Sequence, residues 1–323
     1  MEKSTEHYNN RDILMEKWFK GNIHCHTTNS DGGATPKDLV RYYKEAGFDF
    51  VSITDHNHIT YQEETGFSAQ EILVVPSSEY TRTAKLPGAK VPTQTHVGGI
   101  GLSQNFKFKK KAMTSVEESL QFAVNQVDAQ DGFSVLNHPN WMWSFGMKEI
   151  LAIKNVDAFE IFNGSWDANN EGTPNRPSME QIWDELLSQG KRIWAVAADD
   201  CHFLPDPSVP VNTHPPASGW IHVEGESLTK ESIVQALKEG RFYASTGIEL
   251  HSINLSPDRI GLTIKPASQI EYYTTYIGEN GKTLAVEEGL NSSYDIKGNE
   301  GYIRMRVNCS GMERAWTQPL FLD

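Results

Sequence analysis

The sequence predicts an α/β fold followed by a small antiparallel β domain. Between residues 19 and 247, apolar runs of strand type alternate with segments whose apolar residues recur at helical spacing. Repeated strand–helix units form a largely parallel barrel or sheet, because each helix returns the chain to the same edge. After Ile248, short alternating runs separated by turn residues indicate antiparallel strands. The length of 323 residues and the 38% hydrophobic content allow one large and one small core.

Capping sequences mark the helix starts of the α/β part. Thr35-Pro36-Lys37-Asp38 combines a capping Thr, a Pro at the first helical position and an acid that closes a capping box. Ser115-Val116-Glu117-Glu118 is a second capping box, and further helices are expected near residues 178–188 and after Thr229. The strands expected between these helices are residues 19–24, 48–53, 71–76, 95–102, 133–136, 156–162, 192–198 and 220–223.

Three regions are expected along the chain. Residues 1–20 are polar and form an N-terminal arm, residues 21–247 form the α/β domain, and residues 248–323 form the C-terminal β domain. Within the α/β domain, residues 82–111 are expected to be an elaborated, lysine-rich loop region. The strands expected in the β domain are residues 249–255, 261–265, 271–277 and 302–307.

The composition narrows the range of partners. The net charge of −13 argues against a long nucleic acid, because the average surface repels a polyanion, whereas a small anionic substrate at a cationic metal site remains compatible. The three cysteines are odd in number and widely spaced, which predicts reduced thiols in a cytoplasmic protein. No membrane association is expected, because the N-terminal residues lack an apolar signal region and no apolar run approaches about 20 residues. The sequence leaves the oligomeric state open.

Side chains of metal-binding type follow the ends of the predicted strands. His24 and His26 are two residues apart in an extended segment, so both side chains point to the same face and can converge on one ion. Imidazoles together with carboxylates suit Zn, Mn or Fe better than Mg or Ca. In parallel barrels the chemistry lies at the carboxyl ends of the strands. The side chains that fall there are His24, His26, Asp55, His56, Glu79, His138, Asp200 and His202.

These residues and the motifs around them resemble the PHP (polymerase and histidinol phosphatase) superfamily of metal-dependent phosphoesterases. The resemblance covers residues 21–247, and all nine positions of the family's metal-binding pattern can be placed. It implies a distorted (β/α)7 PHP-type barrel, to which the small C-terminal antiparallel β domain is added. The motifs NHPNW, FNG, AADDCH and GRFYASTG are most similar to the carbaryl-hydrolase-like branch.

The resemblance also implies ligands for two to three divalent metal ions. Glu79 would bridge the first two ions, and Asp31 stands where many family members have His, although Asp is also a competent ligand. The implied ligands are His24, His26, Glu79 and Asp200 for the first ion, Glu79, His96 and His138 for the second, and Asp31, His56 and His202 for the third.

Several residues near these ligands have two alternative interpretations. Asp55 would accept a hydrogen bond from a ligating imidazole, or it would cap the next turn. Arg82 lies three residues after Glu79 and would bind a substrate phosphate, or it would be a solvated surface residue. Asp199 would support a ligand or act as a structural hydrogen-bond acceptor. Trp141 and Trp143 would stack on a base or an aryl leaving group, or pack a loop against the barrel rim.

The predicted function is a metal-dependent hydrolase that cleaves a small phosphate ester, such as a nucleotide or the end of a short oligonucleotide. Ions about 3.5–4 Å apart hold a bridging hydroxide in line with the electrophile, and Glu79, Asp55 and Arg82 are the residues expected to take part in catalysis. The same ions would also serve a carboxyl or carbamate ester, since one ion would polarise the carbonyl. A non-catalytic metal-binding scaffold is the third interpretation. A serine hydrolase is not indicated, because the G-x-S-x-G motif is missing.

Overall fold

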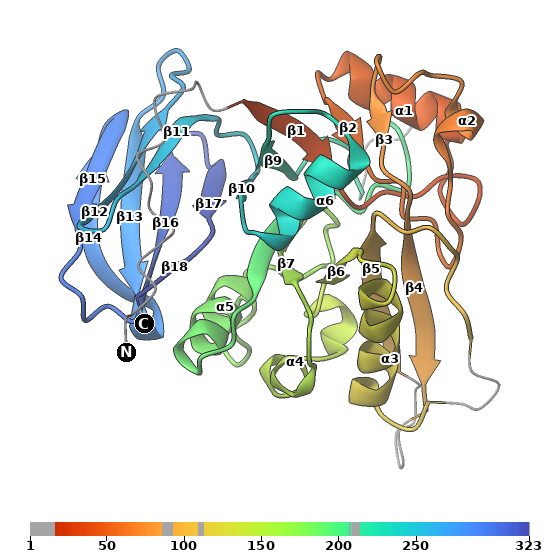
Figure 1. Ribbon diagram of the computed structural model, residues 1–323, viewed down its shortest axis with the longest axis horizontal. Coiled ribbons are helices and arrows are strands. Elements are labelled where there is room, and N and C mark those ends of the chain that lie inside the picture. Colours follow the sequence, from red (N-terminus) through yellow and green to blue (C-terminus); the bar gives the residue numbers. More distant parts are fainter. Residues whose placement is uncertain (1–16, 86–92, 109–112, 207, 209–213, 323) are drawn as a thin grey trace, which may run out of the picture.

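The computed structural model describes residues 17–85, 93–108, 113–206, 208 and 214–322, and Figure 1 shows the arrangement of its elements. The helices of the first part are α1 (Pro36–Glu45), α2 (Gln62–Thr65), α3 (Val116–Asp128), α4 (Met147–Ala152), α5 (Met179–Ser188) and α6 (Lys230–Lys238), with a 3-10 turn η1 (Trp141–Trp143). Its strands are β1 (Trp18–Asn22), β2 (Phe50–Val51), β3 (Leu73–Val74), β4 (Ser77–Ala84), β5 (Thr93–Ile100), β6 (Phe133–Leu136), β7 (Ala158–Asn163), β8 (Trp194–Ala198), β9 (Trp220–Glu224) and β10 (Phe242–Ser245).

These strands form two hydrogen-bonded groups. In the first group, β1 pairs in parallel with β2 and β2 pairs with β3, while β9 pairs antiparallel with both β1 and β10. In the second group, β5 pairs antiparallel with both β4 and β6, whereas β7 pairs in parallel with both β6 and β8. Helix α3 packs against β5 and helix α5 against β7 (Figure 1). The two groups therefore combine parallel and antiparallel pairing.

Among the strands within the described residues, the two groups do not close into one hydrogen-bonded barrel. They meet through isolated bridges between Cys25 and Cys201 and between His56 and Glu79. Strand β4 pairs along its whole length with β5, and toward the segment after β2 it has one isolated bridge. The mixed α/β fold is confirmed, but in place of the expected (β/α)7 closure the two groups approach each other where the candidate ligands lie.

The predicted helix starts are confirmed by their capping hydrogen bonds. Thr35 Oγ1 accepts from the backbone N–H of Asp38 at 3.2 Å, and Ser115 Oγ accepts from that of Glu118 at 3.0 Å. Strand β4 was not predicted, because its alternating Ser, Thr and Arg residues have the composition of a loop. Residues 82–84 of the expected loop region therefore belong to a strand, and of the expected N-terminal arm, residues 18–20 belong to β1. Residues 1–16 lie outside the described part.

The C-terminal part is rich in strands, as predicted. Its strands are β11 (Leu250–Leu255), β12 (Arg259–Ile264), β13 (Tyr272–Gly278), β14 (Lys282–Glu288), β15 (Asn291–Asp295), β16 (Tyr302–Cys309), β17 (Arg314–Thr317) and β18 (Leu320–Phe321), with a 3-10 turn η2 (Glu279–Gly281). The strands β11, β12 and β15 form a separate sheet, and this region lies at one side of the molecule, in blue in Figure 1.

The C-terminal part is joined to the α/β part through a shared sheet. Strand β17 pairs antiparallel with β10, so hydrogen bonding runs from β14 through β13, β16, β17, β10, β9 and β1 to β3. Apolar side chains of β11, β12, β13 and β16 pack into one cluster that also includes Tyr243 of β10. The division into domains after Gly247 therefore stays a prediction.

Two expectations from composition can be compared with the structure. The cysteines Cys25, Cys201 and Cys309 are all free, and the first two are buried. No helix within the described ranges has both the length and the apolar character needed to cross a membrane.

Candidate metal centre

The predicted ligand residues come from separate segments of the chain and meet at the ends of strands. His24 and His26 follow β1, His56 follows β2, and His138 follows β6. Asp200 and His202 follow β8, while Glu79 and His96 lie within β4 and β5. A backbone bridge joins Glu79 to His56 across the gap between the two sheet groups, and the Glu79 carboxylate lies against both His56 and His96.

All nine predicted ligands take part in four overlapping groups. In each group, one nitrogen or oxygen per residue lies within 4.8 Å of the others. Glu79, His24, His26 and His56 each belong to two groups, so the groups are continuous. The groups are His26, Asp31, His56 and His202; His24, His138 and Asp200; His24, His26 and Glu79; and His56, Glu79 and His96.

The rings of the six histidines form a connected series of pairwise contacts. The ring centroids of His26 and His202 are 4.4 Å apart, those of His26 and His56 are 4.5 Å apart, and those of His96 and His138 are 4.9 Å apart. Among the carboxylates, Glu79 is fully buried, Asp200 is 8% exposed and Asp31 has a half-exposed side chain. Access to the centre is therefore from the side of Asp31.

The charges of the centre stabilise one another. Burial opposes ionisation of Glu79, yet His96, His24 and His56 hold the pKa of this carboxyl well below its usual range. Burial also lowers the pKa of His24, but Asp200, Glu160 and Glu79 together raise it to about 10. In the absence of another cation, the carboxylates therefore retain protons on neighbouring imidazoles. A divalent ion competes with those protons for the same nitrogen atoms.

The donor set fits divalent metal ions. Glu79 Oε1 lies 3.0 Å from His96 Nδ1, and Glu79 Oε2 lies 2.8 Å from His56 Nδ1. Even so, Glu79 Oε2 and His96 Nδ1 are buried without a hydrogen bond. His24 Nε2 and His26 Nε2 are only 3.2 Å apart. Imidazole nitrogens and carboxylate oxygens that converge in this way are the ligand types that suit Zn, Mn or Fe.

The backbone at two of these residues is strained. His138 has φ 31° and Asp200 has φ 54°, both in the left-handed region that residues other than glycine rarely adopt. Each such residue costs about 1–3 kcal/mol and persists only where its surroundings hold it in place. The strain therefore indicates that these side chains are directed into the centre at the expense of stability.

Glu160 is a supporting residue that the sequence analysis missed. Its Oε1 lies 2.6 Å from His24 Nδ1, and its Oε2 accepts from the backbone N–H of His138 at 2.7 Å. This carboxylate therefore fixes the ring of His24 so that Nε2 faces the centre. A signal was available, because Glu160 is the one acid in the otherwise apolar run Ala158–Phe162, and a buried acid requires partners.

Two asparagines complete this support. Asn137 Nδ2 donates to Glu79 Oε1 at 2.8 Å. Asn163 Nδ2 donates to Glu160 Oε2 at 2.9 Å and lies 3.3 Å from Asp200 Oδ2. Both asparagines are buried directly at the ends of strands β6 and β7, so they orient the carboxylates without adding charge.

The carboxylate of Asp55 binds hydroxyl and backbone groups of neighbouring loops, and no imidazole of the described residues hydrogen-bonds to it. Its carboxylate accepts hydrogen bonds from the backbone N–H and hydroxyl of Thr27, both at 2.7 Å, and from the hydroxyls of Ser30 and Thr60 at 2.7 and 2.6 Å. Asp55 thus holds the loop that carries Asp31, and the direct imidazole contact proposed for it is made by Glu160 instead. Asp199 is a structural acceptor in the same way, since it binds the backbone N–H groups of residues 217–219.

The phosphate-binding role predicted for Arg82 is not supported by its position. Successive side chains of a strand alternate between faces, so a residue three positions after Glu79 on β4 points to the opposite face. The guanidinium of Arg82 lies over the ring of Phe108 at 5.4 Å, on the side where Tyr80 stacks on the same ring. Arg82 therefore packs outside the centre and does not face it.

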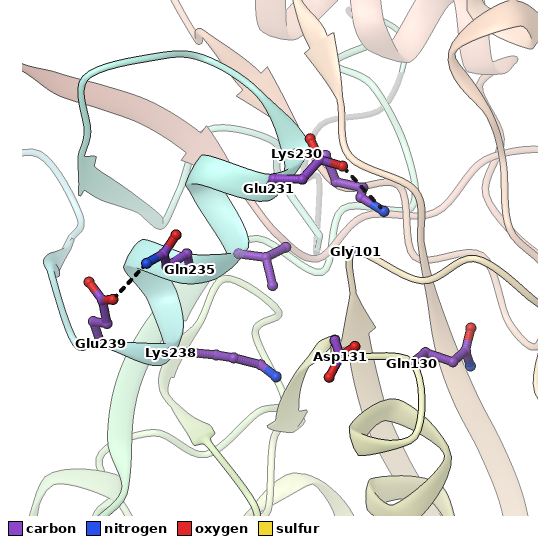
Figure 2. A pocket seen from close by; sticks show the side chains of 9 residues that line it. Gly101, Gln130, Asp131, Lys230, Glu231, Gln235, Lys238 and Glu239 are labelled. Atoms are coloured by element: carbon purple, nitrogen blue, oxygen red, sulfur yellow. Dashed lines mark hydrogen bonds and ion pairs between the residues drawn. The ribbon is translucent and has the colours of Figure 1, made fainter.

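One surface cavity lies away from this centre. It measures about 490 Å³ and is bordered by helix α6 and by the turn before β6 (Figure 2). Asp131, which lines it, precedes the amino end of β6, whereas His138 follows the carboxyl end of the same strand. Its lining includes the basic residues Lys230 and Lys238 and the acidic residues Asp131, Glu231 and Glu239, a mixture of charges that indicates no particular ligand.

No known family model matches this sequence, and no curated protein sequence matches it. Among solved structures, a two-domain protein from Bacteroides vulgatus contains a domain described as a predicted PHP-like metal-dependent phosphoesterase. It superposes with a TM-score of 0.51 over 92% of each chain at 16% sequence identity. PsfC from Pseudomonas syringae matches 69% of this chain and 89% of its own, with a TM-score of 0.42 and 13% identity.

An amidohydrolase from Chromobacterium violaceum, whose crystal structure contains sulfate and no metal, matches 69% of this chain and 96% of its own, with a TM-score of 0.40 and 13% identity. The likeness to the Bacteroides vulgatus protein covers both the α/β part and the β-rich part. The chain thus shares the fold of a two-domain protein that contains a PHP-like domain.

Proposed function

We propose that the protein is a metal-dependent hydrolase of small phosphate esters, with Zn, Mn or Fe as the suitable ions. The observation that carries the proposal is the convergence of six imidazoles and three carboxylates from distant segments into four continuous groups of potential ligands. A cluster with more than one ion position suits a phosphoryl group, because adjacent ions stabilise the charge on several of its oxygens at once. When bound, the ions would also lower the pKa of water toward neutrality.

Different residues of this chain would hold the ions, orient the ligands and border the entrance for the substrate. Glu79 directs its two oxygens to different histidines, His96 and His56, so its carboxylate would contribute to more than one ion position. His24 would offer Nε2 while Glu160 holds the opposite ring nitrogen. Asp31 is the most exposed of the nine and would complete the outermost ion position, where the substrate enters.

The proposal is tested on protein loaded with Mn or Zn. We expect phosphate release from at least one member of a panel of nucleotides and phosphomonoesters, with loss of release after chelation and recovery on adding the ion back. Elemental analysis should find at least two ions per chain. Ions bound without phosphate release from any ester would contradict the proposal, and fewer than two ions would favour a scaffold.

The alternative of a carboxyl or carbamate ester is separated by one comparison. The same preparation is given an aryl phosphate and the corresponding aryl ester. Hydrolysis of the phosphate alone, or preferentially, is the result expected. Preferential turnover of the ester would instead support the similarity of NHPNW and GRFYASTG to the carbaryl-hydrolase-like branch.

A further inference from the structure

We propose that three loops beside the metal centre form an aromatic platform that binds the planar, uncharged ring of an aromatic phosphate ester. The platform consists of Trp141, Met142, Trp166 and Phe203. These residues lie in the loops after β6, β7 and β8, which also carry or adjoin His138, Asp200 and His202. The inference rests on the proposed function and extends it by naming the substrate class.

The platform exposes large apolar side chains to solvent. Trp166 is 73% exposed, Met142 is 63% exposed and Phe203 is 53% exposed. In the described part of the chain, no residue stacks on the Trp166 ring or hydrogen-bonds its indole nitrogen. Scattered exposed apolar residues are common, but a group around a charged centre marks a ligand-binding surface.

Trp141 connects this surface to the metal centre. Its ring centroid lies 5.3 Å from that of His138 and 5.4 Å from that of His96. The indole nitrogen donates to Asp167 Oδ2 at 2.9 Å, and Asp167 is the neighbour of Trp166 in sequence. The indole of Trp141 is therefore fixed against two candidate ligands. Its hydrogen-bond acceptor, Asp167, directly follows the exposed Trp166 in the chain.

A second set of contacts leads to the far side of the centre. Ser165 Oγ donates to Asp167 Oδ1 at 2.7 Å, and because its single proton is used there, His214 Nδ1–H donates to Ser165 Oγ at 2.8 Å. The ring of His214 lies 4.9 Å from that of His202, and the ring of Phe203 lies 6.4 Å from His202. Asp167 thus links the loops after β6, β7 and β8 into one surface.

The backbone holds the exposed residues in place. Met142 has φ 50°, Trp143 has φ 54° and Asn169 has φ 54°, all in the left-handed region. Asn140 and Asn169 donate their side-chain amides to each other's backbone carbonyls at 3.1 and 3.2 Å. Strained residues held by reciprocal hydrogen bonds are typical of ligand-binding segments. The exposure of the apolar side chains is therefore imposed by the fold.

The chemistry of the platform selects its occupant. The metal centre attracts the charged phosphoryl group, and a ring attached to the ester oxygen then falls on the adjoining indole faces. Stacking of a planar ring on one aromatic side chain changes affinity by about tenfold or more, whereas an aliphatic alcohol cannot stack. Aryl groups and nucleobases share this chemistry and are compared separately below.

The experiment uses two readouts on the metal-loaded full chain. The first is kcat/KM for an aryl phosphate, a nucleoside monophosphate and glycerol phosphate. The second is equilibrium binding of phenylphosphonate and propylphosphonate, which cannot be hydrolysed at the phosphorus–carbon bond. Each is measured for the wild type, for W166A and M142A, and for Y273A, a control that removes an exposed aromatic side chain from β13.

We expect aromatic esters to be preferred by at least about tenfold, and phenylphosphonate to bind correspondingly more tightly. W166A should reduce both preferences several-fold while leaving glycerol phosphate and propylphosphonate unchanged, and Y273A should change nothing. A preference for the nucleotide over the aryl phosphate identifies a nucleobase as the occupant. Because a phenol is the better leaving group, an aryl group is identified when W166A lowers kcat/KM for the aryl phosphate more than for the nucleotide.

Equal turnover of aromatic and aliphatic esters, or a preference that survives in W166A and M142A, would overturn the platform while the hydrolase function stands. If no phosphate ester is hydrolysed, the proposed function fails, and phosphonate binding decides the platform independently. Equal affinity for the two phosphonates, or no binding of either, then overturns it.

Discussion

Two buried clusters of charged residues in this protein have opposite designs. In the first, Arg304 of β16 is fully buried and donates to Asp184 at 2.7 Å and to Glu180 at 2.9 Å, both on helix α5. Arg306 donates to the same Glu180, and Tyr302 donates to Asp184. Two cations face two carboxylates, and donors meet acceptors. In the metal centre, by contrast, carboxylate oxygens and imidazole nitrogens face one another.

The comparison shows what separates a structural ion network from a site. Burial and short distances are common to both clusters, so neither identifies a site. Even the Arg304 network leaves the Nη1 atom of its guanidinium without a hydrogen bond, but that group lies 5.0 Å from the centroid of the Trp183 ring. The metal centre leaves acceptor atoms unpaired, and only a cation or protons can satisfy them. Four predictions test this difference, in order of decreasing effect.

The largest effect is expected for Glu79→Gln. The amide keeps the shape of the side chain but loses the charge that faces His96 and His56, so metal content should fall and phosphate release should drop by at least about a thousandfold. The measurements are elemental analysis and kcat for the best ester. Glu287→Gln changes an exposed acid of β14 and is the matched control. Retained metal content in E79Q would contradict the assignment of Glu79 as a shared ligand.

The Arg304 network should respond in stability and not in metal content. Arg304→Met removes one buried cation, which leaves Asp184 without a cationic partner and Glu180 with Arg306 alone, so the free energy of unfolding should fall by about 3–5 kcal/mol. Denaturant unfolding measures the loss. A triple variant that adds Glu180→Gln and Asp184→Asn should recover much of it. Metal binding per folded chain should be unchanged. A loss of bound metal in Arg304→Met would contradict the assignment of the Arg304 network to stability alone.

Glu160→Gln tests the support of the metal centre. The amide cannot act as a charged acceptor for His24 Nδ1, which lies 2.6 Å from the present carboxylate. Loss of such a partner typically costs about 10- to 100-fold in metal affinity or activity, and equilibrium metal titration measures it. Asp55→Asn should reduce metal affinity less, because Asp55 contacts the loop hydroxyls and not an imidazole. A larger loss of metal affinity in Asp55→Asn than in Glu160→Gln would indicate that Asp55, and not Glu160, is the main residue that orients the ligands.

The parts of the fold that sequence reasoning found are those with local causes. The helix starts at Thr35 and Ser115 were predictable because a cap is formed by residues three apart. Strand β4 and the arrangement of the two sheet groups depend on the distant pairing of β4 with β5, for which no local pattern exists. The position of Arg82 could also have been predicted from local spacing. Side chains alternate between the two faces of a strand, so a residue three positions after Glu79 points to the opposite face.

The candidate site shows the same division. The nine side chains were chosen by resemblance and come together, and their role as ligands stays a prediction. The supporting groups were missed because each depends on tertiary contacts: Glu160 meets His24 across 136 residues, and Asp167 meets Trp141 from another loop. His214 had no argued ligand geometry in the sequence, yet its ring lies beside His202. The partner that a polar side chain holds in place depends on which strands become neighbours in the fold.

The smallest effect concerns a buried histidine that belongs to neither cluster. His222 of β9 accepts a hydrogen bond from Trp220 Nε1 at 2.9 Å and stacks on Tyr243, and burial, together with Lys20 and Lys265, lowers its pKa to about 3. Between pH 6.5 and 3 the unfolded chain therefore binds a proton that the folded chain does not, so His222 stabilises the fold above pH 6.5 and this contribution is lost on acidification. From pH 7 to pH 5 we expect a loss of about 1–2 kcal/mol in the free energy of unfolding. His222→Gln keeps an acceptor for Trp220 and should remove this part of the pH dependence, measured by denaturant unfolding at both pH values. Equal slopes in the two proteins would mean that His222 is protonated in the folded state and would contradict its assignment as a buried neutral histidine.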